Sequence, residues 1–175
     1  MILLEIEDFE KFHSLAQGTD DNPLLQSYID RYEEKYIKLI LGVILGQLFI
    51  DDIQGVDSDS AAIEDRFQKL LDKWFEQPID CIYESTGMKD ILASLVFYHY
   101  ASDTQVRHTQ SGVTLNQSEV SNTLSPEGAI RFGEMKWNDA IPSIHAIQWL
   151  CGCHDAETYP EYKGTKFEVK YSPLL

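Results

Sequence analysis

Residues 23–42 read PLLQSYIDRYEEKYIKLILG, and this stretch decides the fold. Asn22 is a favoured residue just before a helix, and Pro23 at the first helical position loses no hydrogen bond. From there apolar residues recur at a spacing of three and four, which predicts an amphipathic helix of about five turns that ends at Gly42. The apolar positions are Leu24, Leu25, Tyr28, Ile29, Tyr32, Tyr36, Ile37, Ile40 and Leu41.

Further helices are predicted on the C-terminal side of this stretch. Residues 43–50 are strongly apolar and predict a short helix in the core. After a turn at residues 55–59, apolar residues at helical spacing predict a helix that begins at about residue 60 and ends at Pro78. Residues 86–101 predict another helix, and because its apolar residues surround much of its circumference, it is expected at the centre.

A polar stretch then interrupts the helices. Residues 104–124 are rich in Thr, Ser, Gln and Asn, with Ser111-Gly112 where a hairpin would turn, and they predict a projecting β-hairpin or a long loop. Ser125, Pro126 and Glu127 have the pattern of a helix start. The helix that follows is expected to reach about residue 153, with a break or kink near Pro142.

The expected fold is therefore mainly α, a helical bundle with a projecting β-hairpin and an extended C-terminal tail. The bundle is expected over residues 1–155, with the hairpin inserted at about 104–124. The tail covers residues 156–175, where Pro160, Gly164 and Pro173 interrupt regular structure, and one strand is expected around residues 166–171.

The composition limits the classes of function. Of the 175 residues, 29 are acidic and 14 are Lys or Arg, so the net charge is −15. This balance argues against phosphate-based binding of nucleic acid and against docking on anionic lipid. The longest apolar run is too short for a bilayer span, so no membrane association is expected. The acidity either keeps the protein in solution or forms a face that does not bind DNA; candidates for such a face are Asp51, Asp52, Asp57 and Asp59.

No residue pattern predicts catalysis. The sequence has no phosphate-binding loop, dinucleotide fingerprint or nucleophile elbow. Cys151-Gly-Cys153-His154 could contribute soft metal ligands, with His145 or Cys81 as a fourth, but the spacing is not that of a zinc site, and core cysteines are the better interpretation. His99, between Tyr98 and Tyr100, is expected to be half-buried and hydrogen-bonded. We therefore expect no enzyme, no cofactor and no metal.

The order of these parts resembles the head–tail connector, or adaptor, proteins of tailed bacteriophages, above all those of crAss-like phages and other phages of gut Bacteroidales. The stretches that carry the resemblance are residues 23–29 (PLLQSYI), 36–42 (YIKLILG), 45–49 (LGQLF), 95–100 (LVFYHY), 106–113 (VRHTQSGV) and 159–162 (YPEY).

The resemblance implies a structural virion protein, made in the cytoplasm of the host bacterium. Such proteins form a ring, commonly of twelve copies, that joins the portal vertex of the head to further ring or tail proteins. DNA passes through the ring without specific binding. The acidic candidates, including Asp57 and Asp59, would line this channel.

The tail is predicted to be a docking arm that orders on a partner, and the resemblance implies that this partner is the portal protein. Its aromatic residues are too irregularly spaced for one helix, and large aromatic side chains on an extended segment are suited to fill pockets on a partner; they are Tyr159, Tyr162, Phe167 and Tyr171. The alternative is that the tail folds back as an edge strand beside the hairpin of its own subunit.

Two other classes of function stay open. One is a different phage part, such as a tail-completion or assembly protein. The other is a cytosolic helical protein-interaction module that binds a partner in a groove between its helices. A small-molecule enzyme is the least favoured alternative.

Overall fold

The computed structural model describes residues 2–9, 23–55, 63–78, 81–104, 106–109, 112–115 and 126–168. It is mainly helical, as the sequence predicts. The helices are η1 (Ile6–Phe9), α1 (Pro23–Leu41), α2 (Val43–Ile53), α3 (Asp65–Leu71), α4 (Met88–Thr104), α5 (Pro126–Trp149) and the π-helical turn η2 (Leu150–His154). The strands are β1 (Trp74–Glu76), β2 (Tyr83–Ser85), β3 (Val106–Thr109) and β4 (Gly112–Leu115).

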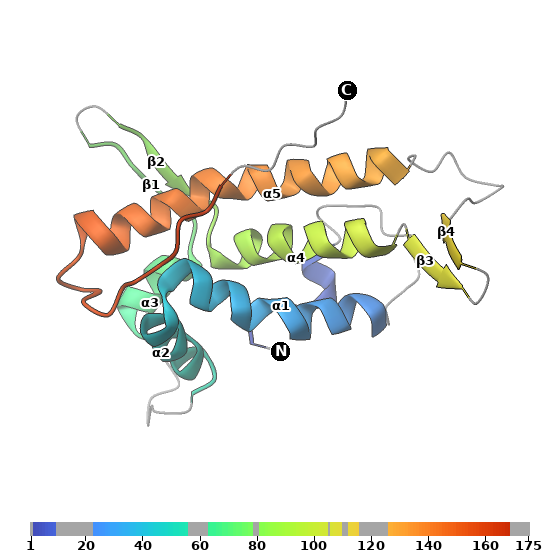
Figure 1. The fold of residues 1–175 in the computed structure, drawn as a ribbon. Coiled ribbons are helices and arrows are strands. Elements are labelled where there is room, and N and C mark those ends of the chain that lie inside the picture. Colours follow the sequence, from blue (N-terminus) through green and yellow to red (C-terminus); the bar gives the residue numbers. More distant parts are fainter. Residues whose placement is uncertain are drawn as a thin grey trace.

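Three long helices form the body of the molecule. Figure 1 shows α1, α4 and α5 side by side, with α4 in the middle and α2 and α3 at one end. Helix α4 packs against both α1 and α5, which confirms its expected central position. The side chains of Ile91, Leu92 and Leu95 on α4 are fully buried.

Helix α1 has the bounds that its apolar stripe predicts. It begins at Pro23 and ends one residue before Gly42, where the chain turns sharply into α2. Gly42 has a φ of 89°, and a Cβ atom there would lie 2.8 Å from the backbone of Lys163. A glycine is therefore required both by the backbone angle and by the close approach of the C-terminal segment.

A buried carboxylate holds the N-terminal segment against α1. Glu33, only 2% exposed, accepts hydrogen bonds from the backbone N–H groups of Leu3 and Leu4 at 2.6 Å and of Ile2 at 2.8 Å. These bonds satisfy the buried Glu33 carboxylate, and they give partners to three backbone N–H groups that have none in a helix or strand. The segment then brings the side chains of Leu4 and Phe9 into the core.

The region after α3 differs from the prediction. The expected helix to Pro78 is wrong, since α3 ends at Leu71 and β1 and β2 form a hairpin. In its register Trp74 lies opposite Ser85, Phe75 opposite Glu84 and Glu76 opposite Tyr83. The inner face packs on α5, where the ring of Tyr83 stacks on Trp149 at 4.0 Å. This contact between distant segments stabilises the hairpin, so local helical spacing could not predict it.

The second hairpin lies where the sequence predicts it. Strands β3 and β4 pair antiparallel within residues 104–124, and they extend beyond the end of the three long helices (Figure 1). Helix α5 begins at Pro126 as predicted. It continues through Pro142, so the helix has no break there, and an irregular turn follows at Leu150–His154.

Candidate functional site

The C-terminal segment 155–168 runs back along its own domain between α1 and α5. On the α1 side, the N–H groups of Lys163 and Thr165 donate to the carbonyls of Leu41 and Leu39 at 3.2 and 2.9 Å. On the α5 side, Gln148 donates to the carbonyl of Thr165 at 2.6 Å. These bonds join the two helices through the segment. Its described part pairs with no strand, so the expected edge strand is absent up to residue 168.

The predicted partner-binding aromatics lie largely inside their own domain. Tyr159 is 1% exposed and Phe167 is 6% exposed, so in this structure neither ring is free to bind a partner. Tyr162 is half-buried, and burial, with smaller effects of Cys151 and Cys153, raises the pKa of its hydroxyl to about 12. Tyr171 lies outside the described residues. The irregular aromatic spacing reflects an extended chain that fills gaps between its own helices.

A close approach of backbones fixes the middle of the segment. A Cβ atom on Gly164 would overlap the carbonyl oxygen of Ile40 and would lie 2.7 Å from the hydroxyl of Tyr162. Only glycine allows the chain to pass this close to the end of α1.

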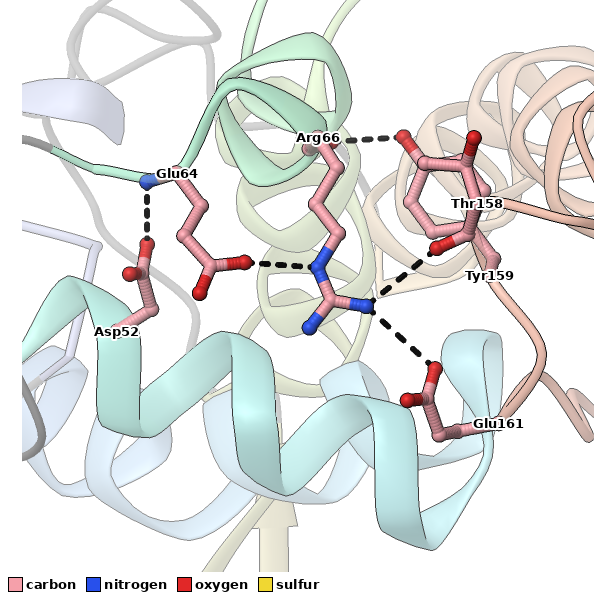
Figure 2. Close-up of polar contacts among 6 residues, drawn as sticks. All are labelled: Asp52, Glu64, Arg66, Thr158, Tyr159 and Glu161. Carbon is pink, nitrogen blue, oxygen red and sulfur yellow. Dashed lines mark hydrogen bonds and ion pairs between the residues drawn. The ribbon is translucent and has the colours of Figure 1, made fainter.

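Arg66 connects α3 to the same segment (Figure 2). Its guanidinium pairs with Glu64 at 2.8 Å and with Glu161 at 3.5 Å, and it donates to the carbonyl of Thr158 at 3.4 Å. In return the hydroxyl of Tyr159 donates to the Arg66 carbonyl at 2.7 Å. The planar guanidinium has enough donors to serve all three acceptors at once. The cluster is a structural junction between α3 and the C-terminal segment.

The acidic channel candidates are only partly placed. On α2, Asp51 accepts a hydrogen bond from Gln47 at 2.7 Å. Asp52 accepts one from the N–H of Glu64 at 3.1 Å and so supports the start of α3 (Figure 2). Asp57 and Asp59 lie outside the described residues. Asp52 therefore has a structural role that its type and position in the sequence did not indicate.

The aromatic rings of α1 and α4 form a stacked cluster. The His99 ring lies 4.0 Å from that of Tyr32 and nearly parallel to it, and its Nε2 is 2.5 Å from the Tyr36 hydroxyl. Burial, with smaller effects of Tyr32 and Tyr98, raises the pKa of Tyr36. The expectation of a hydrogen-bonded, half-buried His99 is confirmed.

The cysteines and histidines near the end of α5 do not converge. Cys151 is buried, whereas Cys153 and Cys81 are exposed. His154 lies 3.0 Å from Glu76 and stacks on Trp149, and His145 lies 3.3 Å from the carbonyl of Phe167. Among the residues that the structure describes, no three His, Cys, Asp or Glu side chains are grouped to hold a metal ion.

An open pocket of about 540 Å³ lies where the C-terminal segment crosses α1 and α5. Its apolar lining includes Tyr36, Leu39, Trp137 and Phe167, and exposed lysines stand at its rim. It is lined by Lys35, Tyr36, Leu39, Trp137, Thr165, Lys166, Phe167 and Glu168. Sequence reasoning missed it because its lining comes from three segments far apart in the chain. The only local signal was the pair Lys166-Phe167, a cation beside an aromatic ring.

We compared the chain with models of known protein families, with curated proteins and with solved structures, and nothing matches it. Over the described ranges, no helix combines the length and the apolar character that a bilayer span needs.

Proposed function

We propose that this chain is a structural subunit of the head–tail connector of a tailed bacteriophage. It would form a ring that joins the portal vertex to the tail and surrounds the DNA channel. The observation that carries the proposal is the hairpin β3–β4, which extends beyond the helical body between α4 and α5 (Figure 1). This agrees with the order of elements that the resemblance implies.

A projecting two-stranded hairpin is suited to contact a neighbouring subunit. Within the described part of the chain, β3 and β4 pair only with each other, so each strand has an edge that could pair further. Isolated two-stranded hairpins are marginally stable and gain from added strands or packing. Contact with an adjacent copy or with the next ring would supply these interactions.

The charge supports the position around DNA. A net charge of −15 would repel the phosphate backbone and allow the genome to pass without binding. Tight binding of duplex DNA at physiological salt, with a steep dependence on salt concentration, would contradict this part of the proposal.

The experiment is electron microscopy of the protein mixed with the portal protein of the same phage. We expect rings that are coaxial with the portal and absent when the protein is left out. A protein that stays monomeric both alone and with the portal would refute the proposal. Gene order offers a second check, since a portal gene on one side and tail genes on the other are expected.

One alternative has a specific observation in its favour. The open pocket between α1, α5 and the C-terminal segment has the size of pockets that bind small molecules or peptide side chains. A helical protein-interaction module, or another phage assembly protein, would use such a pocket for a partner peptide. Binding of a cellular partner by a protein that never forms rings would favour the module.

A further inference from the structure

Positive charge gathers on one surface of this acidic chain. Lys35 of α1 and Lys166 of the C-terminal segment both line the open pocket, and both are exposed. Arg31, also exposed, lies one turn before Lys35, and both cations lie beside one ring. Arg31 Cζ is 5.3 Å and Lys35 Nζ 5.4 Å from the centre of Tyr32. We call Arg31, Lys35 and Lys166 the basic rim.

The charge of the basic rim is not neutralised by strong ion pairs. Among the residues that the structure describes, its two cations on α1 form no ion pair, and the exposed Glu34 of the same helix is paired with Lys38. Lys166 Nζ lies 3.9 Å from Glu168, but these side chains are 84% and 79% exposed, so water and salt weaken the pair. The basic rim therefore keeps positive charge for a partner.

The wall of the pocket is formed before any ligand binds. The Trp137 ring lies 5.9 Å from that of Tyr36 and 6.0 Å from that of Phe167, measured between centroids. Trp137 Nε1 donates to the carbonyl of Glu168 at 3.1 Å, which fixes the indole against the C-terminal segment. Because these side chains are already ordered, binding does not have to order them, and this favours affinity.

Nucleic acid fits the pocket poorly despite the positive rim. Bases bind by stacking on open aromatic faces, whereas Tyr36, Trp137 and Phe167 are only 4%, 8% and 6% exposed. A long duplex would also extend past the basic rim onto the surfaces that give the chain its net charge of −15. A short peptide stays close to the rim, and charges farther than about 8 Å from it are largely screened at physiological salt.

A pocket of about 540 Å³ with apolar side chains in its wall and cations at its rim is suited to one large apolar side chain that has acidic neighbours. We propose that the pocket binds a short acidic segment of a partner protein and takes up one large apolar side chain from it. The acidic residues of that segment lie against the basic rim. The inference goes beyond the proposed ring and does not depend on it, since a single copy contains the whole pocket.

The experiment uses the full chain and a fluorescein-labelled peptide that has one phenylalanine between two pairs of acidic residues. In a fluorescence anisotropy titration we expect saturable binding with a Kd below about 1 mM, and weaker binding as the salt concentration rises. Lys35→Glu and Lys166→Glu, made separately, should each raise the Kd at least about fivefold, because each replaces a cation by an anion. Lys73→Glu is the matched control. It makes the same change of charge at a side chain that is 68% exposed and outside the pocket lining, so the Kd should stay within about twofold.

A second peptide and NMR test where the first one binds. With serine in place of phenylalanine the Kd should rise at least about tenfold, because the apolar anchor is lost. The indole N–H signal of Trp137 should shift when the phenylalanine peptide is added. The three substituted lysines are at the surface, so the thermal midpoints of the variants should match that of the wild type.

Several results would overturn the inference. They are the absence of saturable binding, equal affinity of all three lysine variants, equal affinity of the serine peptide, and an unchanged Trp137 signal. Duplex DNA that displaces the labelled peptide more effectively than unlabelled peptide does would identify a surface for nucleic acid instead, and it would also overturn the inference. The ring proposal is tested separately, because rings with the portal form or fail to form whether or not the peptide binds.

Discussion

Replacing Glu33 by alanine should destabilise the domain far more than an ordinary surface substitution. The carboxylate accepts hydrogen bonds from three successive N–H groups, those of Ile2, Leu3 and Leu4. The hydrogen bond from Leu4 is buried, so leaving its N–H group unpaired would cost about 1–3 kcal/mol of folding stability. The other two donors are partly buried, and each would lose about 1 kcal/mol because water could replace the carboxylate.

Complete detachment of the N-terminal segment gives a similar upper limit for the loss of unfolding free energy. If residues 2–9 leave the domain, Leu4 and Phe9, both fully buried, become exposed at roughly 2 kcal/mol each. Either route gives a loss of about 3–5 kcal/mol. For a domain of this size that corresponds to a fall in the thermal midpoint of roughly 10 °C.

Denaturant unfolding and hydrogen exchange measure this effect. We expect Glu33→Ala to lower the unfolding free energy and to remove protection from the amides of residues 2–4. Glu33→Gln keeps the side-chain volume but places an amide donor against a backbone donor, so it should also lose at least about 2 kcal/mol.

Glu34→Ala is the matched control, because Glu34 is exposed and forms an ion pair with Lys38 in the next turn. It should change stability by about 0.5 kcal/mol or less. A Glu33→Ala protein within about 1 kcal/mol of the wild type, with unchanged exchange at residues 2–4, would show that the carboxylate does not hold the segment.

Three further predictions concern other parts of the chain. Arg66→Ala should lower the free energy of unfolding in denaturant by about 1–2 kcal/mol, because the guanidinium joins α3 to the C-terminal segment. Lys73→Ala, which removes an exposed ion pair, should change it almost not at all. Equal effects of the two substitutions would contradict the junction. Deletion of residues 108–118 should leave the thermal midpoint nearly unchanged and abolish assembly, whereas a large loss of monomer stability would place the hairpin in the core. In the folded protein a thiol reagent should modify Cys153 but not Cys151, whose pKa burial raises from 9.0 to about 12. The thiol of the unfolded chain ionises near pH 9, so the contribution of Cys151 to folding stability is complete below pH 9 and is lost as the pH rises from 9 to 12. A Cys151→Ala protein whose stability falls in the same way between pH 9 and 12 would refute this.

Elements with local signals could be predicted from the sequence. Helix α1 follows from Pro23, the apolar stripe and Gly42, all of which act within one helix. The start of α5 at Pro126 and the hairpin within residues 104–124 likewise carry their own signals. Each depends on residues close in the sequence, and no contact with a distant segment is needed to recognise it.

Elements that depend on distant partners could not be predicted in this way. Trp74 and Phe75 continue the spacing of α3, but the stacking of Tyr83 on Trp149 favours a strand pair. The role of Asp52 depends on the N–H of Glu64, twelve residues away. Propensity is a weak guide where tertiary contacts of this kind decide the structure.

The surface available to a partner in the structure differs from the one that the sequence predicts. The tail was expected to provide aromatic anchors, but Tyr159 and Phe167 already fill gaps in their own domain, and removing them for a partner would expose that core. Large apolar side chains that remain exposed lie elsewhere, and Phe75 and Ile82 are two of them. The C-terminal segment instead contributes Lys166 and Phe167 to the wall of a pocket. Because Tyr159 and Phe167 of this segment are buried in the domain, its truncation should lower the free energy of unfolding.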